Sequence, residues 1–308
     1  MINIFITETH NGANTLSFSS RSKSDEEMTI DTFQSVLALC KNDLDNGICI
    51  SGGEPLLHSK FPELLSTIKD NHQLKSMCFN TSGLMLTSYV IDLIALAKHK
   101  DFLSICLYYR DNEFSPELLD AINNLQENNI KIEIATEVLY TDNQKFNDLI
   151  NFLEKAKLDT LRWEITIPKE KVNPSDFYLS VKSNLVLLLK LCAENKIIPY
   201  TKCNHIPYCF FSSEELRLLS YISNDNFGGL QCSRIICFYP DNSVSGCTVN
   251  FENQNCLKST FVNLTDIKEI LNNKAQVAQK NDVIEACNNC QFKKLIFEKC
   301  GCFLNGHH

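Results

Sequence analysis

Apolar and polar residues follow one another along the first 195 residues in blocks that predict alternating strands and helices. Short apolar runs predict strands at 2–7, 47–50, 74–80, 102–108, 130–136 and 161–167. Apolar residues at helical spacing predict helices at 28–43, 61–72, 86–99, 115–128, 143–157 and 176–195. This repeat favours parallel strands joined by right-handed crossovers. The fold class expected is therefore α/β, with a partial barrel of the (β/α)6 type.

The segments that follow the predicted strands are polar or glycine-rich. In a parallel sheet, ligands bind at the carboxyl ends of the strands, so these segments should converge on one mouth. They are Thr7–His10, Ser51–Glu54, Asn80–Gly83, Tyr108–Arg110, Thr136–Val138 and Thr166–Pro168.

The segment Ser51–His58 reads SGGEPLLH and follows the second predicted strand. Gly52 and Gly53 let the backbone approach a ligand that any Cβ would block. Glu54 adds a carboxylate beside backbone N–H groups, which suits a small ligand that carries an ammonium group. The alternative is an ordinary turn between a strand and a helix.

Composition and charge narrow the function classes. The chain has 308 residues, of which 44% are hydrophobic, and a formal net charge of −8. This charge excludes nucleic acid as the main partner, because phosphate binding needs a basic face. No apolar run approaches the roughly 20 residues of a membrane span, and the first residues lack the pattern of a secretory signal. We therefore expect a cytoplasmic protein that is not in a membrane.

The 15 cysteines fall into two groups. Five are scattered through apolar patterns and are interpreted as small buried hydrophobes: Cys40, Cys49, Cys78, Cys106 and Cys192. The others lie between Cys203 and Cys302, where the strand–helix repeat has stopped. We therefore predict a barrel domain over 1–198 and a small Cys-rich domain over 199–308. A local cysteine cluster in a reducing compartment indicates a metal site.

The spacing of the later cysteines suits either a 4Fe–4S cluster or a tetrahedral zinc ion. Pro240-Asp241-Asn242 predicts the turn of a β-hairpin between two of them. Cys237 and Cys256 fit the spacing loosely, and His58 and His205 are interpreted as structural or surface residues. The candidate metal ligands are Cys203, Cys209, Cys232, Cys247, Cys287, Cys290, Cys300 and Cys302.

Together these motifs resemble the radical SAM superfamily with a C-terminal auxiliary iron–sulfur region of the SPASM or twitch type. SGGEPLL at 51–57 resembles the family's motif for the amino group of S-adenosylmethionine, and FNTSG at 79–83 stands where the family has a TNG-like turn. LSICLYYRDNE at 103–113, the hairpin sequence FYPDNSVSGC and the Cys-rich tail also match. The resemblance implies that Gly52, Gly53, Glu54 and His10 are the residues for cofactor binding.

The chain departs from the family in the loop after the first strand. The family places three cysteines there, spaced CxxxCxxC, which hold the radical-generating 4Fe–4S cluster. In the matching register this chain has His10, Asn14 and Ser17, and no cysteine precedes Cys40. Asparagine and serine offer no thiolate, and iron–sulfur clusters need soft anionic ligands. The sequence therefore predicts a pseudo-enzyme that does not perform radical SAM chemistry itself.

The resemblance implies an accessory or substrate-presenting iron–sulfur protein in the maturation of a ribosomally made peptide. Its partners would be the peptide and a modifying enzyme, either an intact radical SAM enzyme or an ATP-grasp ligase. Two alternatives stay open. One is an enzyme that binds S-adenosylmethionine or uses auxiliary clusters for redox chemistry, with Glu54, His10, Tyr108 and Arg110 as contacts. The other is a structural zinc protein.

Overall fold

The computed structural model describes about three fifths of the chain. The described residues are 2–9, 26–40, 47–71, 74, 76–97, 102–109, 115–138, 143–165, 174–201, 211–222, 235–245 and 264–267. His10, Asn14, Ser17, Arg110 and all eight candidate metal ligands lie outside these residues. The predictions that concern them therefore remain predictions.

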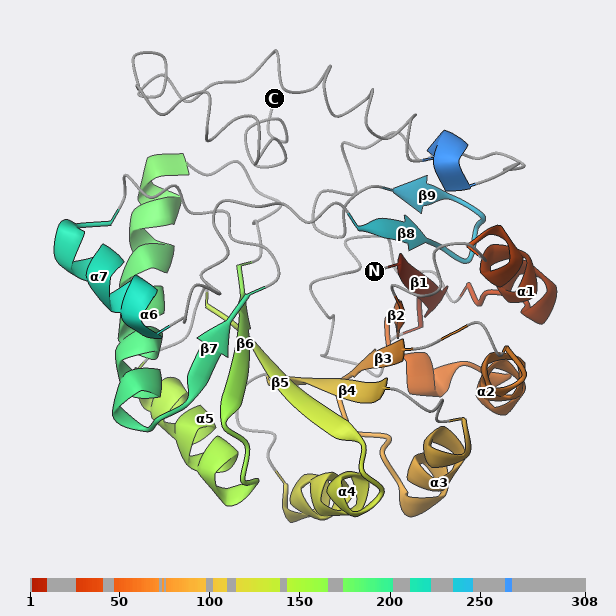
Figure 1. Cartoon of the computed structure of the whole chain (residues 1–308), viewed down its shortest axis with the longest axis horizontal. Coiled ribbons are helices and arrows are strands. Elements are labelled where there is room, and N and C mark those ends of the chain that lie inside the picture. Colours follow the sequence, from red (N-terminus) through yellow and green to blue (C-terminus); the bar gives the residue numbers. More distant parts are fainter. Residues whose placement is uncertain are drawn as a thin grey trace. The chain divides into compact units, whose positions relative to one another are not determined.

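The predicted alternation of strands and helices is confirmed (Figure 1). The strands are β1 (Ile2–Thr7), β2 (Ile48–Gly52), β3 (Ser76–Thr81), β4 (Phe102–Tyr109), β5 (Lys131–Glu137), β6 (Thr160–Glu164), β7 (Ile198–Tyr200), β8 (Ile236–Phe238) and β9 (Val244–Ser245). The helices are α1 (Ile30–Leu39), α2 (Phe61–Lys69), α3 (Ser88–Leu96), α4 (Pro116–Glu127), α5 (Asn143–Lys155), α6 (Pro174–Glu194) and α7 (Ser213–Ile222), with a short 3₁₀ helix, η2, at Pro55–Leu57.

The nine strands form one mostly parallel sheet, which is open across the described strands. This confirms the α/β fold class and the partial barrel. By contacts the chain divides into two compact units. Unit 1 contains 1–108, 114–133 and 234–271, and unit 2 contains 109–113, 134–233 and 272–308. The boundary near residue 198 remains a prediction.

In unit 1 the strand order is β4-β3-β2-β1-β8-β9, and the two faces of this sheet differ in composition. Along one row of partners the residues are Ile2, Ile48, Met77 and Leu103, and along the next row they are Asn3, Cys49, Cys78 and Ser104. Phe61 of α2 packs edge-on against Phe79, which lies on the face of large side chains. Helices α1 to α4 therefore cover the aliphatic face, and small polar and thiol side chains line the other face.

Local capping fixes where three helices of unit 1 begin. The hydroxyl groups of Thr29, Thr87 and Ser115 each accept a hydrogen bond from the backbone N–H three residues further on. Such a bond satisfies one of the amides that the first turn of a helix leaves unpaired. The three residues are the N-caps of α1, α3 and α4.

The predicted hairpin is confirmed and adds a strand to the sheet beside β1. Strand β8 pairs with β1 in parallel, so Asn3 is aligned with Cys237. The Phe5 and Tyr239 rings stack at 4.7 Å, and both residues are buried. At the turn, Asn242 adopts a φ of 62°, and the Asp241 carboxylate accepts a hydrogen bond from the Ser243 amide.

In unit 2, β6 pairs in parallel with β5 on one side and with β7 on the other. Helix α6 contacts both α5 and α7, and an ion pair of 3.2 Å joins Lys182 to Glu215 on α7. No helix among the described residues is long and apolar enough to cross a bilayer.

Candidate functional site

Strand β2 ends with a glycine, Gly52, that its pairing with β1 requires. A Cβ on Gly52 would lie 2.6 Å from the Thr7 carbonyl oxygen, a distance that real Cβ atoms essentially never show. The strands come this close because their pairing has an irregularity between Phe5 and Thr7. Gly52 therefore permits a close approach to the neighbouring strand, and the approach to a ligand that we predicted for it remains a prediction.

The next two residues continue the connection to β1. The Gly53 amide donates to the Thr7 carbonyl at 2.8 Å, and the Glu54 amide donates to the Thr9 carbonyl at 2.8 Å. These bonds extend the pairing of β1 and β2 beyond the end of β2. The chain then turns through η2, whose N-cap is Glu54.

The side chain of Glu54 accepts four hydrogen bonds from the protein itself. Oε1 accepts from the Thr81 hydroxyl at 2.7 Å and from the Leu56 amide at 3.2 Å. Oε2 accepts from the Ser82 amide at 2.8 Å and from the Ser82 hydroxyl at 2.6 Å. An ionised carboxylate offers about four acceptor positions, so these four donors occupy all of them. Glu54 is 1% exposed, and its carboxylate connects the loop after β2 to the turn after β3.

The turn after β3 is ordered around this carboxylate. The Thr81 hydroxyl, which donates to Glu54, also accepts a hydrogen bond from the Gly83 amide at 3.1 Å. Gly83 adopts a φ of 83°, which favours glycine. The sequence placed Ser51–Glu54 and Asn80–Gly83 at one mouth, and in unit 1 the structure brings these two segments together. That Gly52, Gly53 and Glu54 bind a cofactor remains a prediction, as does the part of His10.

A second set of contacts fastens residues 26–28 to the same loop. The Met28 amide donates to the Ile6 carbonyl at 2.7 Å, beside the end of β1. His58 is buried; its Nδ1 accepts from the Lys60 amide at 3.0 Å, so its Nε2–H donates to the Met28 carbonyl at 2.9 Å. The interpretation of His58 as a structural residue is confirmed.

Glu27 completes this attachment through Ser59. Its carboxylate accepts from the Ser59 amide at 2.8 Å and from the Ser59 hydroxyl. Burial alone would raise the pKa of Glu27, but these two hydrogen bonds, with a smaller contribution from His58, lower it. An ionised Glu27 therefore holds residues 26–28 against the loop that contains Ser59.

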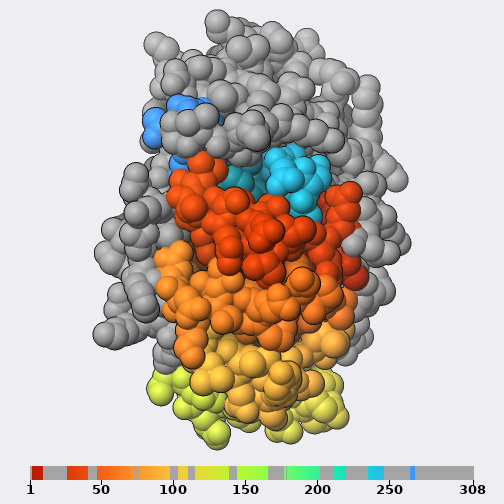
Figure 2. All heavy atoms as spheres, turned by 90° about the vertical axis from the view of Figure 1, so that its right-hand side faces the viewer, coloured from red at the N-terminus to blue at the C-terminus, as the bar shows by residue number. Residues whose placement is uncertain are grey.

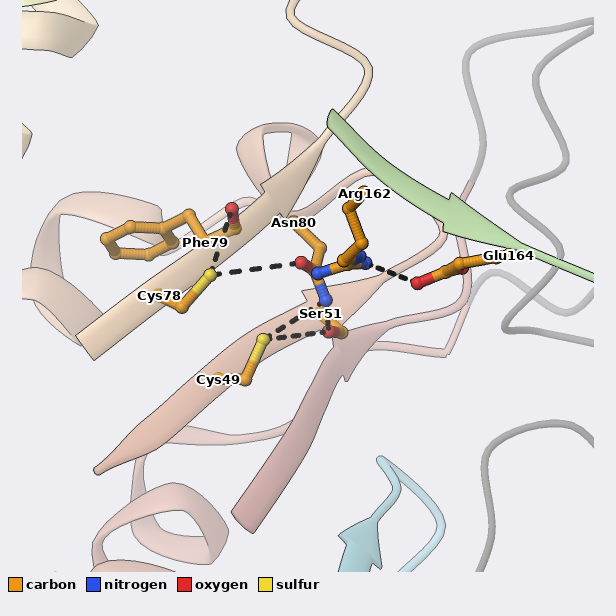
Figure 3. Close-up of polar contacts among 7 residues, drawn as sticks. All are labelled: Cys49, Ser51, Cys78, Phe79, Asn80, Arg162 and Glu164. Atoms are coloured by element: carbon orange, nitrogen blue, oxygen red, sulfur yellow. Dashed lines mark hydrogen bonds and ion pairs between the residues drawn. The ribbon is translucent and has the colours of Figure 1, made fainter. Parts of the chain in front are cut away.

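The small side chains on the other face of the unit 1 sheet form a buried network, drawn in Figure 3. The Asn80 amide group donates to the Ser51 hydroxyl at 2.7 Å and contacts the Cys49 sulfur at 3.1 Å. The Cys78 thiol lies 3.9 Å from the side-chain oxygen, Oδ1, of Asn80. Sequence reasoning missed this network. The alternation of large and small residues in Ile48-Cys49-Ile50-Ser51 was the available signal, because residues two apart share a face.

A buried ion pair lies on β6 in unit 2. Arg162 Nη2 and Glu164 Oε1 are 2.7 Å apart, and the Arg162 side chain is 3% exposed (Figure 3). An arginine at such depth needs a carboxylate partner, because an isolated charge there is strongly unfavourable. The only local signal for this pair in the sequence is the spacing of two residues, which places both side chains on one face of the strand.

The described cysteines are buried, as predicted for the five scattered ones. Cys40, Cys49, Cys78, Cys106 and Cys192 are not in disulfide bonds, and burial raises the pKa of Cys192 to about 12. Cys237 is also buried and packs with Phe5 and Tyr239. Within the described ranges there is no group of three or more His, Cys, Asp or Glu side chains that could hold a metal ion. Tyr108, an alternative contact residue, is half-buried near the end of β4.

No family model matches the sequence. Over 143 residues the chain is 27% identical to GTP 3′,8-cyclase of Clostridium perfringens strain SM101, which covers 44% of each protein. A stretch of 46 residues is 46% identical to the probable GTP 3′,8-cyclase of Methanococcus aeolicus and covers 14% of this chain and 15% of that one. The matches thus span less than half the length of these curated relatives.

Solved structures match over nearly the whole chain. Streptococcus suis SuiB bound to S-adenosylmethionine has a TM-score of 0.66 at 13% identity, over 95% of this chain and 71% of that one. SuiB bound to its precursor peptide SuiA has a TM-score of 0.67 at 14% identity, and the match covers 99% of this chain and 74% of SuiB. The enzyme anSMEcpe with bound S-adenosylmethionine and the Kp18Cys peptide has a TM-score of 0.67 at 14% identity, and the match covers 97% of this chain and 88% of anSMEcpe. The chain therefore has the fold of the radical SAM superfamily, to which SuiB and anSMEcpe belong, and the resemblance to that superfamily is confirmed at the level of the fold.

Proposed function

We propose that this chain is a degenerate member of the radical SAM superfamily that lacks its own radical-generating cluster. In this proposal it serves as an accessory or substrate-presenting iron–sulfur protein in the maturation of a ribosomally made peptide. The C-terminal cysteines would hold its auxiliary cluster or clusters. A peptide and a separate modifying enzyme would be its partners.

One observation carries the proposal: the donor set after β1 does not fit a 4Fe–4S cluster. His10, Asn14 and Ser17 stand at the three cysteine positions, and the sequence has no cysteine before Cys40. Histidine ligates iron in some clusters, but neutral amide and hydroxyl groups are poor replacements for thiolates. Without that cluster no electron reaches S-adenosylmethionine, so the chain has no route to the radical by itself.

The geometry of Glu54 supports the same reading. Its carboxylate is buried and accepts four hydrogen bonds from Leu56, Thr81 and Ser82, so the motif has a structural use without a cofactor. The peptide part of the proposal is supported by solved structures of the same fold, since SuiB and anSMEcpe have been solved with bound peptides.

The test is anaerobic purification followed by iron and sulfide analysis and a reductive cleavage assay with S-adenosylmethionine. We expect iron and sulfide in the chain but no cleavage product. A variant with Cys300→Ser and Cys302→Ser should lose iron, whereas the matched variant with Cys49→Ser and Cys106→Ser should keep it. Reductive cleavage of S-adenosylmethionine by the unmodified chain would overturn the proposal.

A gain-of-ligand variant sharpens this test. Replacing His10, Asn14 and Ser17 together by cysteine restores the family's spacing and should add about four iron atoms per chain. If the unmodified chain already contains these iron atoms in addition to those held by its C-terminal cysteines, the proposed loss of the radical-generating cluster is contradicted. Zinc in place of iron and sulfide in the unmodified chain would favour the structural zinc protein instead.

A second candidate is an enzyme that still binds S-adenosylmethionine. The observation in its favour is that the segment Ser51–Glu54 keeps both its sequence and its place at the carboxyl end of β2, in a fold whose solved relatives hold this cofactor. Titration calorimetry separates the two candidates. An absence of binding at about 1 mM S-adenosylmethionine excludes the second one.

A further inference from the structure

Exposed apolar side chains are concentrated on helix α3 of unit 1 and in the turn before it. Of the six large hydrophobic residues that are exposed in the described part of the chain, four lie between residues 84 and 96. Leu84 and Met85 are 49% and 38% exposed, and Tyr89 and Leu96 are 67% and 64% exposed. We call these four residues the α3 surface. Apolar side chains gathered in this way mark interaction sites on soluble proteins.

The fold does not use these side chains. Helix α3 turns Ile91 and Ile94 toward the core, where both are buried. Tyr89 and Leu96 are seven residues apart and share the opposite face, with the half-exposed Leu93 between them. The helix is therefore apolar around most of its circumference, which is typical of a helix covered on both sides.

Carboxylates are exposed on α3 and on the neighbouring helix α4. Helices α3 and α4 pack side by side in unit 1 (Figures 1 and 2). Asp92 is exposed on α3, and Glu117, Asp120 and Glu127 are exposed on α4. No Lys or Arg occurs in 82–96 or 116–127. The cations that follow these ranges are Lys98 and Lys100, which lie outside the described residues, and Lys131, which is exposed. A hydrogen bond with the Ser115 side chain lowers the pKa of Glu117, so this carboxyl group is ionised at neutral pH.

We propose that the α3 surface is a docking site for a basic amphipathic helix of a partner protein. The apolar ridge of that helix would cover Tyr89 and Leu96, and its flanking Lys or Arg side chains would face Asp92 and the carboxylates of α4. The inference rests on the proposed accessory role, because a protein that works through a second enzyme needs a surface for it.

A second copy of this chain is the less suitable occupant. Each copy carries a net charge of −8, and pairing through α3 would bring the Asp92 side chains and the acidic α4 helices toward one another. Like charges across an interface oppose association, whereas a basic partner turns the same carboxylates into attractive contacts.

The probe for the test is a synthetic helical Leu/Lys peptide, titrated with the full chain and followed by fluorescence anisotropy. Substituting Tyr89→Ser and Leu96→Ser together should weaken binding about tenfold, because two central apolar contacts are lost. The matched control is Leu179→Ser on α6, which is 49% exposed and should change binding less than about twofold. Reversing Asp120→Lys and Glu127→Lys should weaken binding and reduce its dependence on salt.

Three results would overturn the docking site. They are an absence of binding by the unmodified chain, equal binding by the Tyr89→Ser, Leu96→Ser variant, and a dimer in sedimentation velocity that this variant abolishes. The first two results would not contradict the accessory role. That role is tested by the assay for reductive cleavage of S-adenosylmethionine, which is independent of the peptide titration.

Discussion

At the scale of the residue, Glu54 shows how one side chain can carry a family motif and still be used by the fold. Its carboxylate is 1% exposed and connects two loops through Thr81 and Ser82. Buried carboxylates are stabilised when several donors converge on them. The motif alone predicts a ligand contact, whereas the geometry shows that internal donors already occupy its acceptor positions.

Replacing Glu54 by glutamine tests this structural use. The new amide keeps one oxygen as an acceptor and places an NH2 donor at the other position, so either the Thr81 donor or the Ser82 donors would lose their acceptor in a buried site. We expect a loss of about 1–3 kcal/mol in the free energy of unfolding, measured with urea and without any ligand. The matched control is Glu63→Gln, whose carboxylate is 62% exposed and should contribute less than about 1 kcal/mol.

The opposite outcome has a clear meaning. If Glu54→Gln unfolds like the unmodified chain but loses affinity for S-adenosylmethionine, the carboxylate is a ligand contact and its bonds to Thr81 and Ser82 contribute little. The sequence could single out Glu54 because its motif is local. It could not find Thr81 as its partner, because the two residues are 27 positions apart and only the pairing of β2 with β3 brings them together.

At the scale of the element, three helices end in the same way. After α4, α5 and α6 the chain passes through Asn129, Lys157 and Lys196, each with a φ between 53° and 59°. In each case this residue and the next donate to carbonyls of the last turn, as in Leu158 to Leu153 at 2.9 Å. These are Schellman ends, which usually have glycine at the left-handed position.

The helix ends also show what periodicity can predict. The predicted helix 143–157 ends two residues beyond α5, because the buried Ala156 continues the apolar spacing although Lys157 has already left the helical conformation. Glycine would have marked the end, but Lys157 stands there. Strand β7 was missed for a different reason: its three residues, Ile198–Tyr200, are too short a run to stand out.

Replacing Lys157 by glycine should stabilise unit 2. Lysine with a φ of 53° brings its Cβ close to backbone oxygen, and glycine has no Cβ. We expect a gain of about 0.5–1 kcal/mol in the free energy of unfolding by urea. The matched control is Lys190→Gly, an exposed position within α6, which should lose about 1 kcal/mol. Equal losses in both variants would show that the left-handed conformation imposes no strain at Lys157.

At the scale of the whole molecule, unit 1 is assembled from segments that are distant in the sequence. Residues 234–271 belong to the same compact unit as 1–108, and β8 lies beside β1. The sequence predicted the hairpin from Pro240-Asp241-Asn242, because turn residues act locally. Its place in the barrel sheet could not be predicted, since the pairing of Asn3 with Cys237 depends on strand order rather than on either strand's own pattern.

Tyr239 tests whether the hairpin is part of the same folding unit as β1. Its ring stacks on Phe5 at 4.7 Å, and its hydroxyl lies 3.1 Å from the Ser245 hydroxyl in the buried interior. Substitution Tyr239→Ala removes this ring from a packed core and should cost about 3–5 kcal/mol in the free energy of unfolding. Circular dichroism during a urea titration measures it, with Tyr89→Ala as the matched control, since Tyr89 is 67% exposed. A loss confined to the hairpin, with the cooperative transition of unit 1 unchanged, would show that β8 only rests against β1. A lower midpoint for that transition would show that residues from both ends of the chain stabilise one core.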